Sequence, residues 1–254
     1  MTTPTERSID VGDAVGGAAV TALTYPTAGA PVATLVLGHG AGADQHSAFM
    51  TLCGHGLSAL GIETVTFNFL YTEQKQRRLP DRRPVLEACY RAVVEAVGRD
   101  LGDRPLFIGG KSMGGRIATH IAAADPHLPV QGLVLLGYPL HPPGRPAERR
   151  DAHLHGVGRR TLFVQGSRDT FGTPEELGPA LASMSAISAI SPGPDLHVVA
   201  GGDHSFKVTR AARAAAGAPP ATQDDVHDEI LRTIARWIDR VTRERASGTR
   251  SHAG

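Results

Sequence analysis

Short apolar runs alternate with segments of helical periodicity along most of the chain. Several of these runs are continuous stretches of Val, Leu, Ile and Phe, as is typical of strands that are covered on both faces. The predicted strands are 18–24, 33–38, 64–68, 106–109, 132–136, 161–165 and 197–200. Strands that alternate with helices indicate βαβ units, so we predict an α/β fold with a mostly parallel central sheet flanked by helices.

Helical patterns lie between and after these strands. Apolar residues recur every three or four positions over 49–60 and over 84–97. Pro84 suits the first turn of the second helix, where its missing N–H is not needed. The last predicted helix, 222–243, carries isoleucines and Trp237 along one side and charged residues along the other, which indicates an amphipathic helix packed on the sheet.

Both ends of the chain are polar and rich in small residues. We expect residues 1–8 to be frayed, residues 1–17 to form a tail that leads into the first strand region, and residues 244–254 to form a flexible tail. The only insertion long enough to cover a site is 141–160, which is too short to fold as a separate domain. We therefore predict a single domain over 18–243 with a minimal lid.

Charge and cysteine content exclude several classes of protein. The 254 residues include 26 Lys+Arg and 25 Asp+Glu, a formal net charge of +1, which argues against a protein that binds nucleic acid by neutralising phosphates. The basic stretch 75–83 lacks interleaved aromatic residues and is interpreted as a solvated loop.

The longest mostly apolar run, 130–140, is about half of what a membrane-spanning helix needs. With two cysteines and no visible secretory signal, we expect a cytoplasmic protein that binds neither nucleic acid nor membrane.

The strongest chemical signal is the sequence G-K-S-M-G at 110–114, which has the form G-x-S-x-G. The motif alone is weak in a chain with 30 glycines, but here it lies directly between a predicted strand and a helical segment. A nucleophile at such an elbow sits on a sharp, strained turn, and small flanking residues let the strand and helix pass closely. We therefore predict that Ser112 is a nucleophile.

A serine hydroxyl needs a general base and an orienting acid to act at neutral pH. In folds with this elbow the chain order is Ser, then Asp or Glu, then His. Asp169 ends the turn after strand 161–165, and His204 follows the last predicted strand. Asp203 is the weaker acid because neighbouring side chains point apart, and the glutamates at 175–176 are expected to begin a helix. The predicted acid and base are thus Asp169 and His204.

A glycine-rich loop at 38–42 follows an earlier strand and stands where this kind of fold supplies an oxyanion-hole N–H. The second N–H comes from the residue after the nucleophile. We assign these donors to Ala41 and Met113. His39 is better explained as a structural hydrogen-bonding group in this loop than as a second base. The residues predicted to contact substrate are His39, Gly40, Asn68 and Tyr71.

Lys111 and Arg116 lie on either side of the nucleophile. A Ser–Lys dyad is disfavoured because the elbow turns neighbouring side chains apart. A salt bridge that locks the elbow is the simpler role for Lys111 or Arg116, and binding of an anionic group on the substrate is the alternative.

A group of histidines could suggest a metal site. His153 and His155 lie near His141 and Asp151 in sequence. The proline-rich flanks favour a short lid over this stretch instead. We predict no metal and no cofactor.

These residues together resemble the α/β-hydrolase superfamily, and the chain is most similar to its small dienelactone-hydrolase-like branch, closest to the predicted hydrolases grouped with the Tex and KANL proteins. The similar segments are GHGAGAD at 38–44, GGKSMGGR at 109–116, YPLHPPGRP at 138–146, RDAHL at 150–154, FVQGSRDTFGTPEEL at 163–177 and GGDHSF at 201–206. The resemblance spans about residues 18–240 and implies the triad Ser112, Asp169 and His204. The chain departs from it around 68–71, where relatives usually have a proline before the tyrosine.

The residues and the resemblance predict a serine hydrolase, carboxylesterase-like, that cleaves an ester or related acyl bond. Its partner would be a small-molecule acyl substrate. Because no large lid is expected, the site should be open and suited to small, soluble substrates rather than long-chain lipids. The alternative is a catalytically silent binding or scaffold protein that keeps the fold. Every catalytic position is filled, which favours the enzyme.

Overall fold

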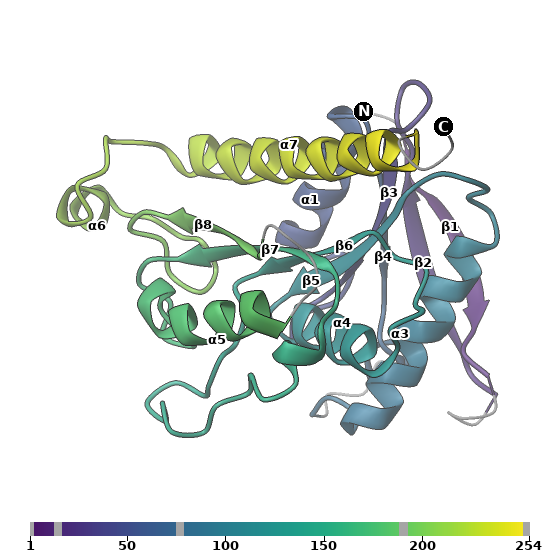
Figure 1. Cartoon of the computed structure of the whole chain (residues 1–254), viewed down its shortest axis with the longest axis horizontal. Coiled ribbons are helices and arrows are strands. Elements are labelled where there is room, and N and C mark those ends of the chain that lie inside the picture. The colour runs from purple at the N-terminus through teal and green to yellow at the C-terminus, as the bar shows by residue number, and fades with distance from the viewer. Residues whose placement is uncertain (1–2, 13–16, 75–78, 188–192, 251–254) are drawn as a thin grey trace.

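Eight strands form one sheet within the part of the chain that the computed structural model describes, residues 3–12, 17–74, 79–187 and 193–250 (Figure 1). They are β1 (Thr5–Asp10), β2 (Ala19–Tyr25), β3 (Ala33–Gly38), β4 (Ile62–Phe67), β5 (Leu106–Lys111), β6 (Gly132–Leu136), β7 (Arg160–Gly166) and β8 (Asp195–Val199). All seven predicted strands are present, with ends that differ by at most two residues.

The strand order across the sheet is β1-β2-β4-β3-β5-β6-β7-β8. The pairs β1–β2 and β2–β4 are antiparallel, and every other pair is parallel. The predicted mostly parallel sheet is therefore confirmed. β3 and β5 are neighbours, with Gly38 opposite Gly110, so the loops that follow these two strands lie side by side. In parallel sheets of this kind, ligands bind at the carboxyl ends of the strands.

Helices cover both faces of the sheet. Figure 1 shows α1 and α7 on one side and α3, α4 and α5 on the other. The helical elements are α1 (Ala48–Ala59), α2 (Leu70–Glu73), α3 (Arg83–Gly98), α4 (Met113–Ala124), the short 3₁₀-helix η2 (Leu154–Gly156), α5 (Pro174–Ile187), α6 (Arg210–Ala215) and α7 (Gln223–Arg250). The predicted helices 49–60 and 84–97 correspond to α1 and α3.

Apolar side chains of the parallel strands fill the core on both faces of the sheet. On β3, Val36 packs in the cluster on the α3 and α4 side, whereas Leu35 and Leu37 pack in the cluster on the α1 and α7 side. Successive side chains of a strand point to opposite faces, so a strand covered on both sides must be apolar throughout. This is why the continuous apolar runs predicted the parallel strands well.

The expectation of a frayed N-terminus over residues 1–8 is wrong from Thr5 onward. Thr5–Asp10 form β1, which pairs with β2 along its whole length. The strand lies at the edge of the sheet, and only Ile9 is buried. Edge strands with one solvent-facing side carry mostly polar residues, so this strand lacked the apolar run that marked the others.

The expectation of a flexible tail from residue 244 is also wrong as far as Arg250. Helix α7 continues to Arg250 rather than ending at 243. The Arg160 side chain on β7 forms an ion pair of 2.7 Å with Glu244 in this added stretch. Polar helix ends carry no apolar stripe, and hydrophobic periodicity therefore placed the end of the helix too early.

The segment 141–160 contains no large lid. It is tied back onto the molecule, because the Tyr138 hydroxyl donates to the Arg150 carbonyl at 2.7 Å and Leu154 is fully buried. The prediction of a minimal lid is confirmed.

Residues 75–78 of the basic stretch lie outside the described residues. No helix in the described ranges is long and apolar enough to span a membrane.

Candidate active site

Ser112 lies at the sharp turn between β5 and α4. Its φ of 50° and ψ of −111° are rare for a residue with a side chain, and its amide donates to the Leu136 carbonyl at 2.9 Å. A Cβ at Gly110 or at Gly114 would overlap the carbonyl oxygen of Gly38 on the neighbouring strand. The turn therefore requires glycine at both outer positions of the G-x-S-x-G motif, as the sequence predicts.

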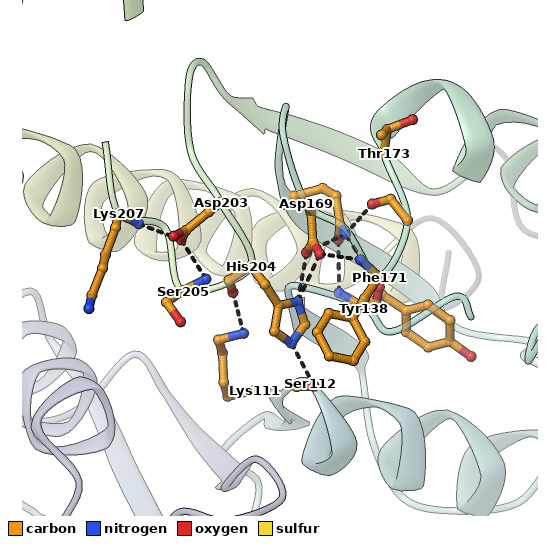
Figure 2. Close-up of polar contacts among 12 residues, drawn as sticks. Lys111, Ser112, Tyr138, Asp169, Phe171, Thr173, Asp203, His204, Ser205 and Lys207 are labelled. Atoms are coloured by element: carbon orange, nitrogen blue, oxygen red, sulfur yellow. Dashed lines mark hydrogen bonds and ion pairs between the residues drawn. The ribbon is translucent and has the colours of Figure 1, made fainter. Parts of the chain in front are cut away.

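Ser112, His204 and Asp169 form one hydrogen-bonded chain (Figure 2). The Nε2 atom of His204 is 2.9 Å from Ser112 Oγ, and its Nδ1 atom is 2.8 Å from Asp169 Oδ2 and 3.0 Å from Oδ1. Because a carboxylate can only accept, the proton lies on Nδ1, and Nε2 is left to accept from the serine. The three side chains come from the loops after β5, β7 and β8, which meet at the carboxyl edge of the sheet.

Asp169 is completely buried and its carboxylate is held by several donors. The Gln165 amide donates to Oδ2 at 2.9 Å, and the Phe171 N–H donates to Oδ1 at 2.8 Å. Gln165 is itself fixed, because its side chain also binds the backbone of Tyr138 and Gly172. These bonds satisfy a buried charge and set the direction of the carboxylate.

Asp203 is not part of the hydrogen-bonded series Ser112, His204 and Asp169. Its Oδ1 accepts the amides of Ser205 and Lys207, at 2.8 Å and 2.9 Å, and so closes the turn that carries His204 (Figure 2). The glutamates at 175–176 lie in the first turn of α5, as expected.

Lys111 contacts the loop that carries His204. Its Nζ donates to the carbonyl oxygen of His204 at 2.6 Å and lies 5.3 Å from the centre of the Phe206 ring. Burial lowers the pKa of Lys111 to about 8. Among the described residues no carboxylate forms an ion pair with Lys111, so the expected salt bridge is replaced by a bond to a backbone carbonyl.

The two residues predicted to supply oxyanion-hole amides lie at the cavity next to Ser112. The residues Ala41 and Met113 both line the cavity beside Ser112. Neither amide has a hydrogen-bond partner within the described part of the chain. Met113 is the first residue of α4, where the N–H groups of a helix are free to bind an anion.

Of the four residues expected to contact substrate, the structure brings only Gly40 to the cavity wall. His39 is fully buried: Phe69 N–H donates to its Nε2 at 3.2 Å, and its Nδ1 bonds to the Gly40 carbonyl at 2.9 Å. Burial also lowers the pKa of His39, which keeps the ring neutral. This agrees with a structural role for His39.

Asn68 and Tyr71 lie behind the same loop. Asn68 accepts the Gln45 amide at 3.0 Å and donates to Glu73 at 3.2 Å. The Tyr71 ring is buried, with its centre 5.9 Å from that of His39. Both side chains therefore shape the loop rather than line the cavity.

A cavity of about 510 Å³ opens over Ser112. Its apolar lining comes from Phe49, Met50, Leu86, Met113, Pro139 and Phe171. Its charged lining comes from Asp81, Arg83, Lys111, Arg116 and Arg150. The space accommodates a small ligand, and it is lined by more positive than negative groups.

Sequence patterns missed two side chains that position the predicted base and acid. The Phe171 ring stacks on the His204 imidazole, with centres 4.1 Å apart, and Gln165 orients Asp169 as described above. Gln165 had a detectable signal, since it is a polar residue at the end of a buried strand. Phe171 had none, because a single aromatic residue in a loop has no characteristic spacing.

The histidines of the 141–160 segment do not converge. His153 stacks on His120 at 3.6 Å between ring centres and bonds to Thr119 Oγ1 at 2.8 Å, whereas His141 bonds to the Pro142 carbonyl. The described residues contain no group of three or more His, Cys, Asp or Glu side chains arranged to hold a metal ion.

Comparison with known proteins agrees with this fold. The model of a family described as an alpha/beta hydrolase domain matches residues 31–239. The chain belongs to this family. The resemblance to the α/β-hydrolase superfamily, and the fold expected from it, are thereby confirmed.

Solved structures share the fold at low sequence identity. An α/β serine hydrolase without a lid from Xanthomonas campestris is 20% identical, with 93% of this chain and 96% of that chain covered and a TM-score of 0.64. A dienelactone hydrolase from Anabaena variabilis is 21% identical, with 85% and 95% covered and a TM-score of 0.58. Est1E from Butyrivibrio proteoclasticus, solved with ferulic acid bound, is 14% identical, with 90% and 99% covered and a TM-score of 0.64.

Proposed function

We propose that this protein is a serine hydrolase that cleaves an ester or related acyl bond of a small substrate through an acyl-enzyme on Ser112. The observation that carries the proposal is the continuous hydrogen-bonded chain from Ser112 Oγ through His204 to the buried carboxylate of Asp169. Strain at the nucleophile and two unpaired amides beside it support the same role.

In the first half of the reaction, Ser112 Oγ attacks the substrate carbonyl carbon while His204 Nε2 takes the hydroxyl proton. Asp169 holds the Nδ1–H tautomer and stabilises the imidazolium. The carbonyl oxygen becomes an oxyanion, which the N–H groups of Ala41 and Met113 stabilise; one such donor contributes about 3 kcal/mol. When the intermediate collapses, His204 returns the proton to the leaving alcohol, and the acyl group remains on Ser112.

In the second half, water takes the place of the alcohol. His204 removes a proton from the water as its oxygen attacks the acyl-enzyme, and the same amides hold the second oxyanion. Collapse returns the proton to Ser112 Oγ and releases the carboxylic acid. Lys111 and Phe171 hold the histidine in place through both halves, from its carbonyl and from its ring face.

We also propose that the protein stands in the dienelactone-hydrolase-like branch, nearest the Tex and KANL-like predicted hydrolases, and that it acts on short acyl groups. The similar segments at 138–146 and 163–177 support the first point. A cavity of about 510 Å³ without a large lid supports the second. Among the proteins that share the fold, one is a dienelactone hydrolase and another, Est1E, binds ferulic acid, which is a small carboxylic acid.

The test is hydrolysis of p-nitrophenyl esters of increasing acyl length. We expect acetyl and butyryl esters to react faster than decanoyl esters. Ser112→Ala and His204→Ala should each lower kcat by a thousandfold or more, whereas Ser183→Ala on α5, remote from the cavity, should leave it unchanged. Folded variants with wild-type rates would contradict the proposal, whereas a folded wild-type protein that hydrolyses none of the esters would favour the catalytically silent scaffold. Faster turnover of decanoyl esters would contradict the short-chain preference alone.

A further inference from the structure

Three arginines from three separate elements meet at the cavity over Ser112. Arg83 comes from the start of α3, Arg116 from the first turns of α4, and Arg150 from the segment before η2. We call these three residues the arginine wall. Phe49 and Met50 of α1 line the cavity as well, so it has both a cationic and an apolar lining.

Arg116 is the member of the arginine wall nearest the chemistry along the chain. It follows Ser112 by one helical turn, and its amide donates to the Ser112 carbonyl at 3.1 Å. Its side chain is partly buried, and its Nε atom is buried without a hydrogen-bond partner within the described residues. A buried guanidinium donor without a partner is costly, because its lost contact with water is not replaced.

Of the three members of the arginine wall, Arg83 alone has a carboxylate partner in the described part of the chain. Glu87 bonds to Arg83 Nε at 3.2 Å. Asp151 pairs with Arg149, and Asp81 is the one carboxylate among the described residues that line the cavity. Within the described part of the chain, neither Arg116 nor Arg150 forms an ion pair. Burial, followed by the positive charges of Arg150 and Arg83, lowers the pKa of Arg116.

Lys111 also lines the cavity, but its charge is engaged. Its Nζ donates to the carbonyl of His204, so this lysine supports the base rather than a ligand. Among the cationic residues of the cavity wall, Arg116 and Arg150 are the two whose side chains have no hydrogen-bond or ion-pair partner in the described part of the chain. Guanidinium forks match the paired oxygens of a carboxylate or a phosphate, and such bonds are stronger than neutral ones.

We propose that the substrate of this site carries an anionic group, a carboxylate or a phosphate, in addition to its scissile acyl bond, and that Arg116 and Arg150 bind it. Arg83 lies at the exposed rim and contributes attraction over a longer range. The inference rests on the proposed acyl hydrolase function of the same site. It narrows the substrate class from any small ester to a small ester with a second, negatively charged end.

The kinetic test compares three p-nitrophenyl esters: the pentanoate, the glutarate monoester of the same acyl length, and the ester of 3-phosphonopropionic acid. The wild-type protein should hydrolyse at least one anionic ester with a kcat/KM about tenfold or more above that of the pentanoate. Arg116→Gln and Arg150→Gln should each remove most of this preference through KM and leave the pentanoate within about threefold. Arg116→Lys should recover part of it. The anionic ester that is preferred identifies the group.

Arg232→Gln is the matched control, since this exposed arginine lies on α7, away from the cavity. It should leave all three rates unchanged. An equal or faster rate with the pentanoate in the wild-type protein would overturn the inference, and so would equal losses on neutral and anionic esters in the arginine variants.

A binding measurement separates failure of this inference from failure of the proposed function. Calorimetric titration of Ser112→Ala with glutarate and with 3-phosphonopropionate requires no turnover. Binding that weakens about tenfold when Arg116→Gln is added supports the inference even if the wild-type protein hydrolyses none of the esters, in which case the hydrolase proposal alone fails. Absence of binding of both anions to folded Ser112→Ala overturns the inference even if the pentanoate is hydrolysed.

Discussion

Asp169 is the best-shielded member of the hydrogen-bonded chain, and its carboxylate depends on groups beyond His204. Gln165 and the Phe171 amide donate to the two carboxylate oxygens, so protein groups satisfy the buried charge. Asp169 and His204 could be predicted because each follows a strand in the order that the elbow requires. Gln165 could not be assigned a role, since its partners are backbone groups of Tyr138 and Gly172 that only the fold brings near.

The histidine pair His120 and His153 makes the stability of the protein sensitive to acid. Burial, together with the positive charge of Arg116, lowers the pKa of His120 to about 4, and burial and the neighbouring His120 lower that of His153 to about 3. In the unfolded chain both titrate near 6.5. Below pH 6.5 the unfolded state therefore binds protons that the folded state does not, and the free energy of unfolding falls as pH decreases towards 4.

His153→Gln tests this sensitivity while keeping a donor for Thr119. Between pH 7.5 and pH 5 the wild-type protein should lose about 1 kcal/mol more stability than the variant, after allowance for the partial exposure of the ring. Urea unfolding at the two pH values measures the difference. An identical pH dependence in the two proteins would show that His153 takes up its proton without cost to the fold.

At the scale of elements, the close packing of β3, β5 and α4 fixes the position of Ser112. Gly38 lies against Gly110 and Gly114, and neither of those two glycines has room for a side chain. The G-x-S-x-G pattern predicted this crossing because its glycines are a steric requirement. β1 and the end of α7 escaped prediction because their sequences contain few apolar residues, and hydrophobic periodicity detects only those.

Two glycine-to-alanine changes within helices should have opposite effects. Gly114→Ala on α4 should destabilise the protein by about 3 kcal/mol, because its Cβ would overlap the backbone of β3. Gly98→Ala on α3 should stabilise it by about 0.5 kcal/mol, because the added methyl group would meet only Leu106 Cδ2, at 3.9 Å, and alanine favours the helix. Denaturant unfolding checks both. A Gly114→Ala protein as stable as Gly98→Ala would contradict the tight crossing.

At the scale of the whole molecule, the strand order gathers loops that are far apart in the chain. β3, β5, β7 and β8 all end at the same edge of the sheet, which brings Ala41, Ser112 and His204 around one cavity and buries Asp169 against His204. The alternation of strand and helix patterns predicted the α/β class, and the family resemblance predicted the α/β-hydrolase fold. The sequence raised anion binding by Arg116 as an alternative, but the convergence of Arg116 with Arg83 and Arg150 could not be foreseen, because nothing in the sequence indicates that α3, α4 and the segment before η2 line the same cavity.

The central claim is that Ser112 is an activated nucleophile in an assembled site. The most direct measurement is intact mass spectrometry after treatment with a fluorophosphonate probe, followed by peptide mapping. The account predicts one adduct on Ser112 in the wild-type protein, none in Ser112→Ala, and strongly slowed labelling in His204→Ala. A folded wild-type protein that stays unlabelled, or an adduct that persists in Ser112→Ala, would contradict it.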